Sequence, residues 1–342
     1  MKRLRPFVFS HIQVIVIFFI CCLLLLDTSI VDAKIVFCIE GDIYVMNDDG
    51  TGRRRLTKNT VSRDKQPRWS PDGKRIAFTR RMDKRQSTFE LFIMNADGTN
   101  VQRLTDNNVL DIGSSWSPDG KRIAFSSVRS GRWEVHVIDL TTLHVTQLTD
   151  IEDGGEDAGS PDWSPDGTQI VYEKFTDSGI RNIYVMSANG EDQRPLLPDP
   201  KQDDEATDKY LPRWSADGER ILFDDCVWEN DFHRCRLTVA TLRGNAKQIK
   251  GIYDTLDNLG KNLRVLVGAM CWMDNDKALL FDLKMLDTPK PNYDLYRYDF
   301  NTRNLKRLTR GEEDEDYPDW IEGTLSVSPQ DKKKVTWGTL KQ

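Results

Sequence analysis

Carboxylates recur at a nearly fixed distance before five of six regularly spaced tryptophans, and they are the main candidates for chemistry in this 342-residue sequence. Five of the six tryptophans have an aspartate four to six residues ahead of them: Asp64, Asp111, Asp157, Asp208 and Asp316. Grouped carboxylates bind divalent cations through oxygen ligands, and they attract basic peptide segments. The alternative is that each aspartate is solvated or caps a strand end locally.

The tryptophans mark an internal repeat, which is the first feature that a fold assignment has to explain. The decamer WSPDGKRIAF at residues 69–78 returns unchanged at 116–125, and progressively altered copies begin at the later tryptophans. Successive steps are 47, 47, 51, 58 and 48 residues. The six repeat tryptophans are Trp69, Trp116, Trp163, Trp214, Trp272 and Trp320.

Each repeat predicts four short antiparallel strands, here called A to D, and no convincing helix. Between the tryptophan strand A and strand B stands Ser-Pro-Asp-Gly, whose proline, aspartate and glycine suit a tight turn. Alternating runs such as FELFIMN at 89–95 predict strand C, and VQRLT at 101–105 predicts strand D. A four-stranded sheet with two apolar faces must pack against neighbours, and radial closure of such sheets gives a β-propeller.

The chain ends fit the same ring. Residues 34–57 predict strands B, C and D without a tryptophan strand, whereas Trp320 supplies a tryptophan strand without a blade behind it. The predicted fold is therefore an all-β, six-bladed propeller of four-stranded antiparallel blades, with N- and C-terminal strands sharing one blade. Because the repeated decamer forms the inner hairpin, its recurrence reflects packing rather than catalysis.

This fold predicts that all the D-to-A connections emerge on one face, beside the central channel. The five aspartates would then form an acidic channel mouth that holds a protein or peptide. At the fifth tryptophan, Lys261 and Arg264 take the place of the acid. No cofactor is expected, with a divalent cation at the acidic mouth as the open alternative.

The segment 224–235 (DDCVWENDFHRC) is predicted to be a B-to-C loop on the same face. Its aromatic residues Trp228 and Phe232 either contact a partner or pack over an outer strand. Cys226 and Cys235 flank the loop, and an oxidising compartment would allow a disulfide that pins it. The alternative is a pair of free, buried thiols.

The N-terminus indicates export. Basic residues at 2, 3 and 5 precede an apolar run at 7–26, and Val31 and Ala33 are small residues at the positions that a signal peptidase reads. A signal peptide over 1–33 and a single propeller over 34–342 follow, with a periplasmic or secreted location. An uncleaved membrane anchor is the alternative, since the run is long enough to span a bilayer. The net formal charge of −6 disfavours nucleic acid as a partner.

The repeats resemble those of a known family. The motifs PxWSPDGxxIAF, IYVMNxDG and RLT, in register over about residues 35–325, are similar to the propeller repeats of TolB-like proteins, without the α/β domain that precedes the TolB propeller. The resemblance implies an extracytoplasmic, propeller-only protein similar to TolB. We expect a monomeric binding scaffold whose partner is a protein or peptide, with an envelope lipoprotein as one candidate. The alternative is a carbohydrate-active enzyme, since oligogalacturonate lyases carry similar repeats.

Enzyme signals are poor in this chain. His136, His144 and His233 are the only histidines after residue 33, and neither HExxH nor GxSxG occurs. The sequence therefore predicts no catalytic residue and a non-enzymatic protein.

Overall fold

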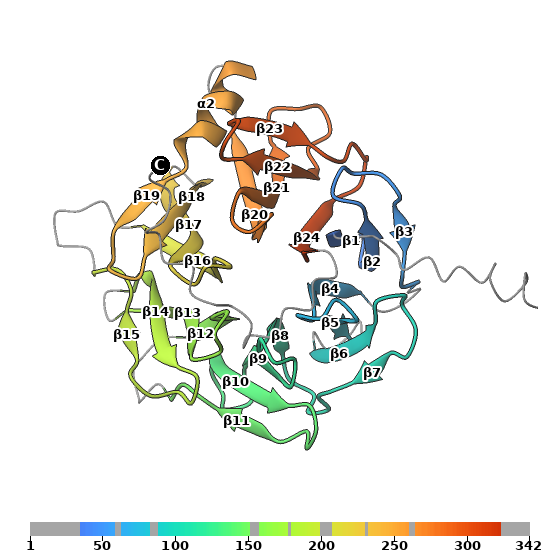
Figure 1. Ribbon diagram of the computed structural model, residues 1–342, viewed down its shortest axis with the longest axis vertical. Helices are drawn as coiled ribbons and strands as arrows, with labels where there is room; N and C mark the ends of the chain where they lie inside the picture. The colour runs from blue at the N-terminus through green and yellow to red at the C-terminus, as the bar shows by residue number, and fades with distance from the viewer. Residues whose placement is uncertain are drawn as a thin grey trace, which may run out of the picture. The chain divides into compact units, whose positions relative to one another are not determined.

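The structure, a computed structural model, describes residues 35–58, 63–82, 88–150, 157–176, 179–198, 207–229, 232–259 and 264–322. In Figure 1 these residues form six sheets around a central axis. Each sheet has four antiparallel strands, and the sixth has the order β24-β1-β2-β3. Strand β24 pairs with β1 from Ile35↔Trp320 to Ile39↔Glu315, so the two ends of the described chain close the ring as predicted. The predicted signal segment lies outside the described residues.

The strands of the blades follow the predicted A-to-D order from the axis outwards. The A strands are β4 (Asp64–Trp69), β8 (Asp111–Trp116), β12 (Ala158–Trp163), β16 (Asp208–Trp214), β20 (Val265–Met273) and β24 (Glu315–Trp320). The B strands are β5 (Arg75–Arg81), β9 (Arg122–Ser127), β13 (Gln169–Phe175), β17 (Arg220–Glu229), β21 (Ala278–Met285) and β1 (Ile35–Ile39). The C strands are β6 (Phe89–Asn95), β10 (Glu134–Asp139), β14 (Arg181–Ser187), β18 (Phe232–Thr241), β22 (Tyr293–Asp299) and β2 (Asp42–Met46). The D strands are β7 (Gln102–Arg103), β11 (Val145–Gln147), β15 (Arg194–Pro195), β19 (Ala246–Gln248), β23 (Asn304–Arg307) and β3 (Arg54–Arg55). We number the blades 1 to 6 from β4 onwards.

Six apolar clusters form the core, and each lies between two neighbouring blades. The cluster around Trp163, for example, joins Val135 of blade 2 to Ile170 and Tyr172 of blade 3. Five repeat tryptophans are 5–8% exposed, and the sixth, Trp320, is half-buried. The tryptophans therefore fill the wedge between sheets, which is the packing role predicted for the decamer.

Other residues of the decamer also have structural roles. In blade 1, Ser70 Oγ donates to Asp72 Oδ1 at 2.7 Å and accepts from the Arg75 backbone at 2.9 Å, which closes the turn. The guanidinium of Arg75 then stacks 4.8 Å from the ring centre of Trp116 in the next blade. Arg122 over Trp163 repeats this contact at 4.7 Å.

Among the described residues a helix interrupts the all-β pattern, so the expectation of no helix was wrong at this point. Helix α2 (Lys250–Leu259) lies between β19 and β20, within the 58-residue repeat. Its buried face, Ile252, Tyr253 and Leu256, packs into the cluster between blades 4 and 5. The Tyr253 hydroxyl accepts the backbone N–H of Leu237 at 2.8 Å, which anchors the helix to β18.

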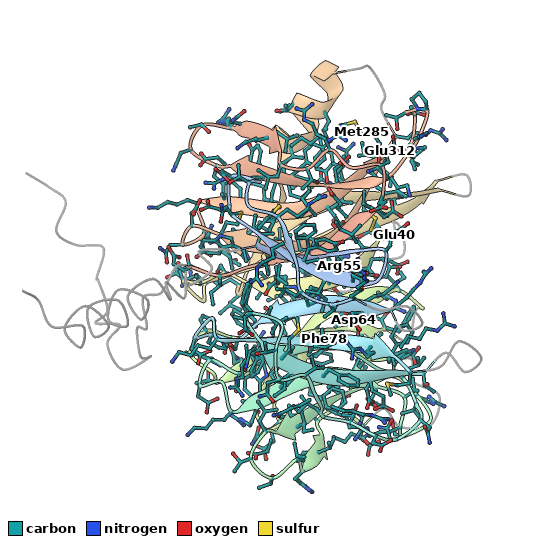
Figure 2. All side chains as sticks on the ribbon, turned by 90° about the vertical axis from the view of Figure 1, so that its right-hand side faces the viewer. Glu40, Arg55, Asp64, Phe78, Met285 and Glu312 are labelled. Atoms are coloured by element: carbon teal, nitrogen blue, oxygen red, sulfur yellow. A yellow bond between two sulfur atoms is a disulfide. The ribbon has the colours of Figure 1, made fainter. Side chains whose placement is uncertain are left out.

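The ring has two different ends. We call the end with the B-to-C turns and D-to-A connections the loop end, and the end with the Ser-Pro-Asp-Gly turns the turn end. In the side view of Figure 2, Glu40 of a B-to-C turn, Met285 at the end of β21 and Glu312 of a D-to-A connection lie towards the same end. The predicted mouth belongs to the loop end.

Candidate functional site

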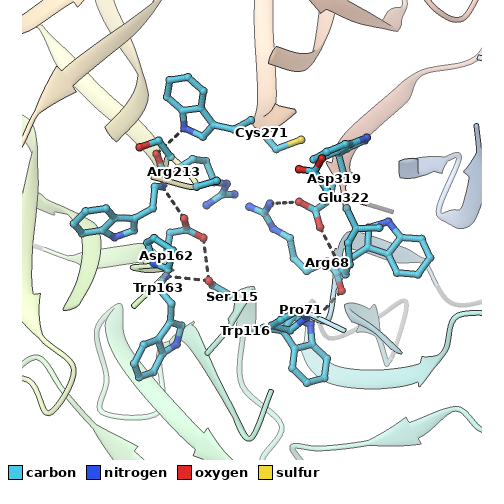
Figure 3. A pocket seen from close by; sticks show the side chains of 18 of the residues that line it. Arg68, Pro71, Ser115, Trp116, Asp162, Trp163, Arg213, Cys271, Asp319 and Glu322 are labelled. Carbon is cyan, nitrogen blue, oxygen red and sulfur yellow. Dashed lines mark hydrogen bonds and ion pairs between the residues drawn. The ribbon is translucent and has the colours of Figure 1, made fainter. Parts of the chain in front are cut away.

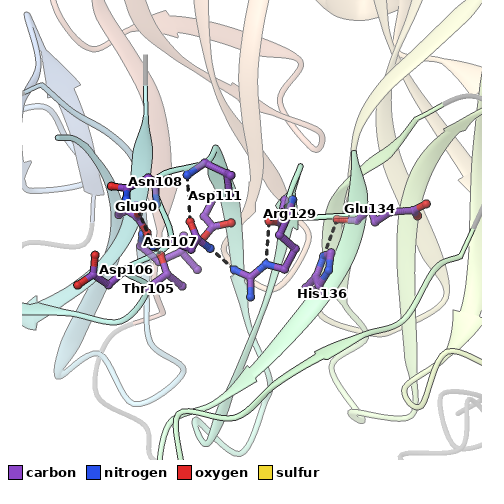
Figure 4. Close-up of polar contacts among 12 residues, drawn as sticks. Glu90, Thr105, Asp106, Asn107, Asn108, Asp111, Arg129, Glu134 and His136 are labelled. Atoms are coloured by element: carbon purple, nitrogen blue, oxygen red, sulfur yellow. Dashed lines mark hydrogen bonds and ion pairs between the residues drawn. The ribbon is translucent and has the colours of Figure 1, made fainter. Parts of the chain in front are cut away.

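Two of the five predicted mouth aspartates are buried in ion pairs of their own blades. Asp64 is 0% exposed, and both of its oxygens accept from the Arg80 guanidinium, at 2.7 and 2.9 Å. Asp111 is also 0% exposed, and its Oδ2 accepts from Arg129 and from Asn107, each at 2.9 Å (Figure 4). These carboxylates are already neutralised inside the fold.

Two more of the predicted aspartates join neighbouring blades. Asp157 Oδ1 accepts the backbone N–H of Trp133 at 3.2 Å, which ties the start of blade 3 to blade 2. Asp208 Oδ1 accepts the backbone N–H of Arg181 at 2.8 Å, which ties blade 4 to blade 3. Both side chains act as local caps, the alternative considered from the sequence.

Asp316 differs from the other four. Its side chain is half-buried on β24, and no cation of the described residues lies within ion-pairing distance of it. Burial raises the pKa of Asp316 to about 7, Lys65 opposes the shift and Asp314 adds to it. Asp316 is thus a carboxylate held without full neutralisation.

The five aspartates therefore do not form one ring of free carboxylates, and their contact with a partner stays a prediction. Lys261 lies outside the described residues, and Arg264 is ion-paired with Asp287 at 2.9 Å. Within the described chain, no group of three His, Cys, Asp or Glu side chains is arranged to hold a metal ion.

Three buried acids that the sequence analysis missed occupy equivalent positions behind the inner strands. Glu173, Asp224 and Asp282 each follow the buried aromatic residue of a B strand. The A strands bulge at this level, and Leu211 and Tyr317 sit there with φ of 53°. The bulges turn backbone N–H groups towards the preceding blade, and Glu173 Oε2 accepts from Leu211 at 3.0 Å.

Asp282 makes the equivalent contact by accepting the Tyr317 backbone N–H at 2.9 Å. Its approach to the A strand needs a glycine, because a Cβ on Gly268 would lie 2.1 Å from Asp282 Oδ1. An acid inside the apolar run ALLFDLKM at 278–285 was the signal in the sequence.

These carboxylates influence one another across blades 4 to 6. Burial raises the pKa of Asp282 to about 8, and the charge of Asp316 adds to the shift. Burial and the charges of Asp282 and Asp225 raise the pKa of Asp224 well above its usual value. Asp224 Oδ1 has no hydrogen-bond partner in the described part of the chain. We call Asp224, Asp225, Asp282, Asp314 and Asp316 the acidic sector.

The segment 224–235 was wrongly predicted to be a loop. Strands β17 and β18 span 10 residues each and pair from Arg220↔Thr241 to Glu229↔Phe232. The predicted disulfide is present, and it joins the cross-strand pair Cys226 and Cys235. Trp228 and Phe232 lie on these paired strands, and their side chains lie outside the described part of the structure. Cys38 and Cys271 are free and buried.

At the turn end the channel opens into a cavity of about 470 Å³. Its wall is formed by the residue before each repeat tryptophan, which the six A strands bring together (Figure 3). We call these residues the inner ring: Arg68, Ser115, Asp162, Arg213, Cys271 and Asp319. This end carries more chemically varied side chains than the repeats suggested.

The acids of the inner ring are fully engaged. Asp319 Oδ1 accepts from Arg68 at 2.8 Å, and its Oδ2 accepts the Trp69 backbone N–H at 2.8 Å. Asp162 accepts from Ser115 Oγ at 2.9 Å and from the Trp214 backbone at 2.9 Å. Burial raises the pKa of Asp162 to about 6, against the opposing charge of Arg68. The four oxygens thus bridge neighbouring blades.

The described histidines form no catalytic group. His136 is 1% exposed on β10, and its Nδ1 contacts the Glu134 carbonyl oxygen at 3.1 Å (Figure 4). Burial lowers the pKa of His136, which keeps the ring neutral. His144 is exposed beside the turn between β10 and β11, and the side chain of His233 lies outside the described residues.

Comparison with known proteins confirms the resemblance of the repeats. A family model described as "TolB beta propeller domain" matches residues 79–226. No curated protein sequence matches the chain. Within the described residues, no helix combines the length and apolar character needed to cross a membrane.

Solved structures share the fold at low identity. TolB from Acinetobacter baumannii superposes with a TM-score of 0.66 and 16% identity, over 85% of this chain and 67% of that chain. A putative TolB from Agrobacterium tumefaciens gives 0.54 and 20%, over 63% and 76%. An oligogalacturonate lyase in complex with manganese gives 0.50 and 15%, over 81% and 74%. At these identities the likeness shows the fold alone.

Proposed function

We propose that this chain, a closed ring of six blades built from TolB-type propeller repeats, is a non-catalytic binding module. In this proposal its loop end captures a basic segment of a protein or peptide. The observation that carries the proposal is the acidic sector, in which Asp224, Asp282 and Asp316 share a buried region that lacks a matching set of cations. A lysine or arginine side chain brought by a partner would supply the missing charge.

The predicted mouth aspartates take different parts in this proposal. In this proposal Asp316 faces the partner together with its neighbour Asp314, which pairs with Lys284 at 3.3 Å. Asp225, 22% exposed and 3.9 Å from the Lys209 ammonium, flanks them on blade 4. Asp64 and Asp111 hold the wall through their ion pairs. The stapled β17–β18 hairpin extends the loop end, and Trp228 and Phe232 on it stay candidates for partner contact.

The setting is proposed to be outside the cytoplasm. A signal peptide over residues 1–33 and a disulfide both suit an oxidising compartment. An envelope lipoprotein, the partner class implied by the TolB resemblance, is the first macromolecule to test. The closed ring supports such a role because it holds loops of six blades in fixed positions.

The test uses fluorescein-labelled hexalysine as the probe and fluorescence anisotropy at low salt. The double variant Asp314→Asn/Asp316→Asn is expected to bind the probe several-fold more weakly than the unmodified protein. Asp254→Asn/Glu219→Gln is the matched control, because it removes the same charge from two exposed residues on α2 and at the turn end. Equal binding by the two double variants would refute the proposal.

The pH dependence gives a second readout. Because burial holds the pKa of Asp316 near 7 and that of Asp282 near 8, both carboxyls are partly protonated at neutral pH. Binding a cation favours their charged forms and releases protons, so affinity for hexalysine rises from pH 6 to pH 8.5. Affinity that is flat or falls over this range would contradict a role for these carboxyls.

A further inference from the structure

The inner ring at the turn end contains one cation that the fold leaves unused. Arg213, on β16, donates one hydrogen bond, from Nη1 to the Pro212 carbonyl oxygen at 3.1 Å. Its Nε is buried and has no hydrogen-bond partner among the described residues, and no carboxylate of that part of the chain pairs with it. A guanidinium has five N–H donors and keeps its charge, so the described residues use little of this capacity.

The remaining arginines of this end have structural partners. Arg68 pairs with Asp319 at 2.8 Å, and Arg220 pairs with Asp217 at 2.9 Å while stacking on Trp272. Arg122 stacks on Trp163 in the wedge between blades. Arg213 makes neither kind of contact, so neither charge pairing nor packing accounts for it.

The surroundings of Arg213 form a cavity of suitable size for a ligand. The cavity of about 470 Å³ lies within the range of about 300–1,000 Å³ typical of small-molecule sites. The repeat tryptophans of all six blades are among the residues that line it, but five of them are only 5–8% exposed, so the apolar surface that they add around the polar inner ring is small. Figure 3 shows the guanidinium groups of Arg68 and Arg213 pointing into this central space.

The geometry points to a binding site for a small carboxylate at the turn end, with Arg213 as its receptor. The planar fork of a guanidinium matches the two oxygens of a carboxylate and binds them bidentately. Among the described residues no ion pair joins Arg213 to the acids of the inner ring, whose four oxygens accept hydrogen bonds from Arg68, Ser115 and two backbone N–H groups. The site lies at the opposite end of the channel from the acidic sector, so it stands or falls independently of the proposed function.

The ligand carries an apolar or aromatic body in addition to its carboxylate. Asp162, Asp276 and Glu322 also line the cavity, so a multiply charged anion is disfavoured. Asp276 is neutralised by Arg220 and two backbone N–H groups, and Glu322 accepts from Asn275 at 3.0 Å. A singly charged acid with a ring-sized body, or an aromatic amino acid, fits both the charge and the tryptophan lining.

The experiment uses 4-fluorobenzoate, with fluorine NMR line broadening as the readout, and the neutral 4-fluorobenzamide as the matched probe. We expect the benzoate to bind and the benzamide to bind at least tenfold more weakly. Binding of 4-fluorophenylalanine is measured as well, because a simple acid and an amino acid would both bind through a carboxylate. Tighter binding of 4-fluorophenylalanine than of the benzoate identifies an amino acid as the ligand class, and weaker binding identifies a simple acid. Equal binding of the benzoate and the benzamide would overturn the proposal.

Variants then assign the site. Arg213→Gln is expected to weaken 4-fluorobenzoate binding at least tenfold, whereas Arg122→Gln, which removes a stacked arginine outside the cavity, leaves it unchanged. Arg213→Lys keeps the charge without the fork and gives an intermediate loss. A second measurement uses the unmodified protein, so that a misfolded variant cannot mislead. Phenylglyoxal modifies arginine side chains, and 4-fluorobenzoate is expected to protect Arg213 from this modification, as measured by peptide mass spectrometry. Unchanged binding in Arg213→Gln, or no protection of Arg213, contradicts the assignment.

Discussion

The two ends of the central channel treat charge in opposite ways. At the turn end every inner-ring carboxylate is satisfied and one arginine is left over. At the loop end Asp64, Asp111, Asp157 and Asp208 are held by ion pairs or backbone hydrogen bonds, and the surplus is negative and buried behind the strands. Because the repeat builds both ends from the same strands, function is to be sought where blades depart from the repeat rather than where they agree.

The largest expected effect concerns the loop-end aspartates that serve the fold. Asp64→Asn leaves the Arg80 guanidinium, which lies beside the rings of Phe78 and Phe92, without its bidentate partner. Breaking a buried ion pair by removing one partner costs about 3–5 kcal/mol of the free energy of unfolding, measured by urea denaturation. Asp106→Asn is the matched control, since Asp106 is 77% exposed in its ion pair and changes stability by under about 1 kcal/mol. If both variants lower the free energy of unfolding by a similar small amount, Asp64 is not a structural aspartate distinct from the exposed ones.

The acidic sector is expected to destabilise the fold as the pH rises, whereas the ion-paired aspartates stabilise it. Burial raises the folded-state pKa of Asp282 to about 8, far above its value in an unfolded chain, so the fold favours the neutral carboxyl. This contribution is fully present below about pH 4 and is lost as the pH rises through 8, which lowers the free energy of unfolding by a few kcal/mol. Asp282→Asn is expected to flatten the dependence between pH 5 and pH 8.5. An unchanged slope would show that Asp282 is not the buried, unneutralised group described here.

The stapled hairpin tests whether loop-end extensions are stabilised separately. The disulfide closes a loop between residues nine positions apart, which corresponds to about 2–3 kcal/mol from restriction of the unfolded chain. Cys226→Ser/Cys235→Ser should therefore lower stability by that amount and speed amide exchange in β17 and β18. Exchange in β5 and β6, the unstapled equivalents in blade 1, is the internal reference. Equal acceleration in both hairpins would mean that the bridge stabilises the ring globally.

The smallest effect belongs to the turn end. Arg122→Met removes a cation stacked 4.7 Å from the ring centre of Trp163 but keeps much of the packing. The expected loss is about 0.5–1 kcal/mol, measured by thermal unfolding and reduced by added salt. A loss above about 3 kcal/mol would indicate that these stacks carry more of the blade-to-blade packing than the tryptophans alone suggest.

The six-bladed ring could be predicted from the sequence because the signals for it are local in the chain. The Ser-Pro-Asp-Gly turn closes through bonds such as Ser70 to Asp72, and the tryptophan spacing gives the number of sheets. Helix α2 was missed although Ile252, Tyr253 and Leu256 have the spacing of a helical face, because every other repeat predicted strands alone. The long repeat that ends at Trp272 was the remaining sign of an insertion.

The ion pairs and the contacts of the buried acids were harder to predict from the sequence. Asp64 and Arg80 are 16 residues apart, and their pairing depends on a bulge between Lys65 and Arg68 that sets the register. Likewise, Asp282 meets the Tyr317 backbone only after the ring closes. Sequence shows which acids exist, but partner assignment needs the register of each sheet and the contact between blades.

Hydrogen exchange of the full ring, with and without saturating hexalysine, tests capture at the loop end most directly. Capture at the loop end predicts protection in the β23–β24 connection around residues 310–318 and at the start of β20, next to the acidic sector. It predicts no change in the Ser-Pro-Asp-Gly turns at 70–73 and 117–120, which lie at the turn end. Protection confined to those turns, or spread evenly around the ring, would contradict capture at the loop end.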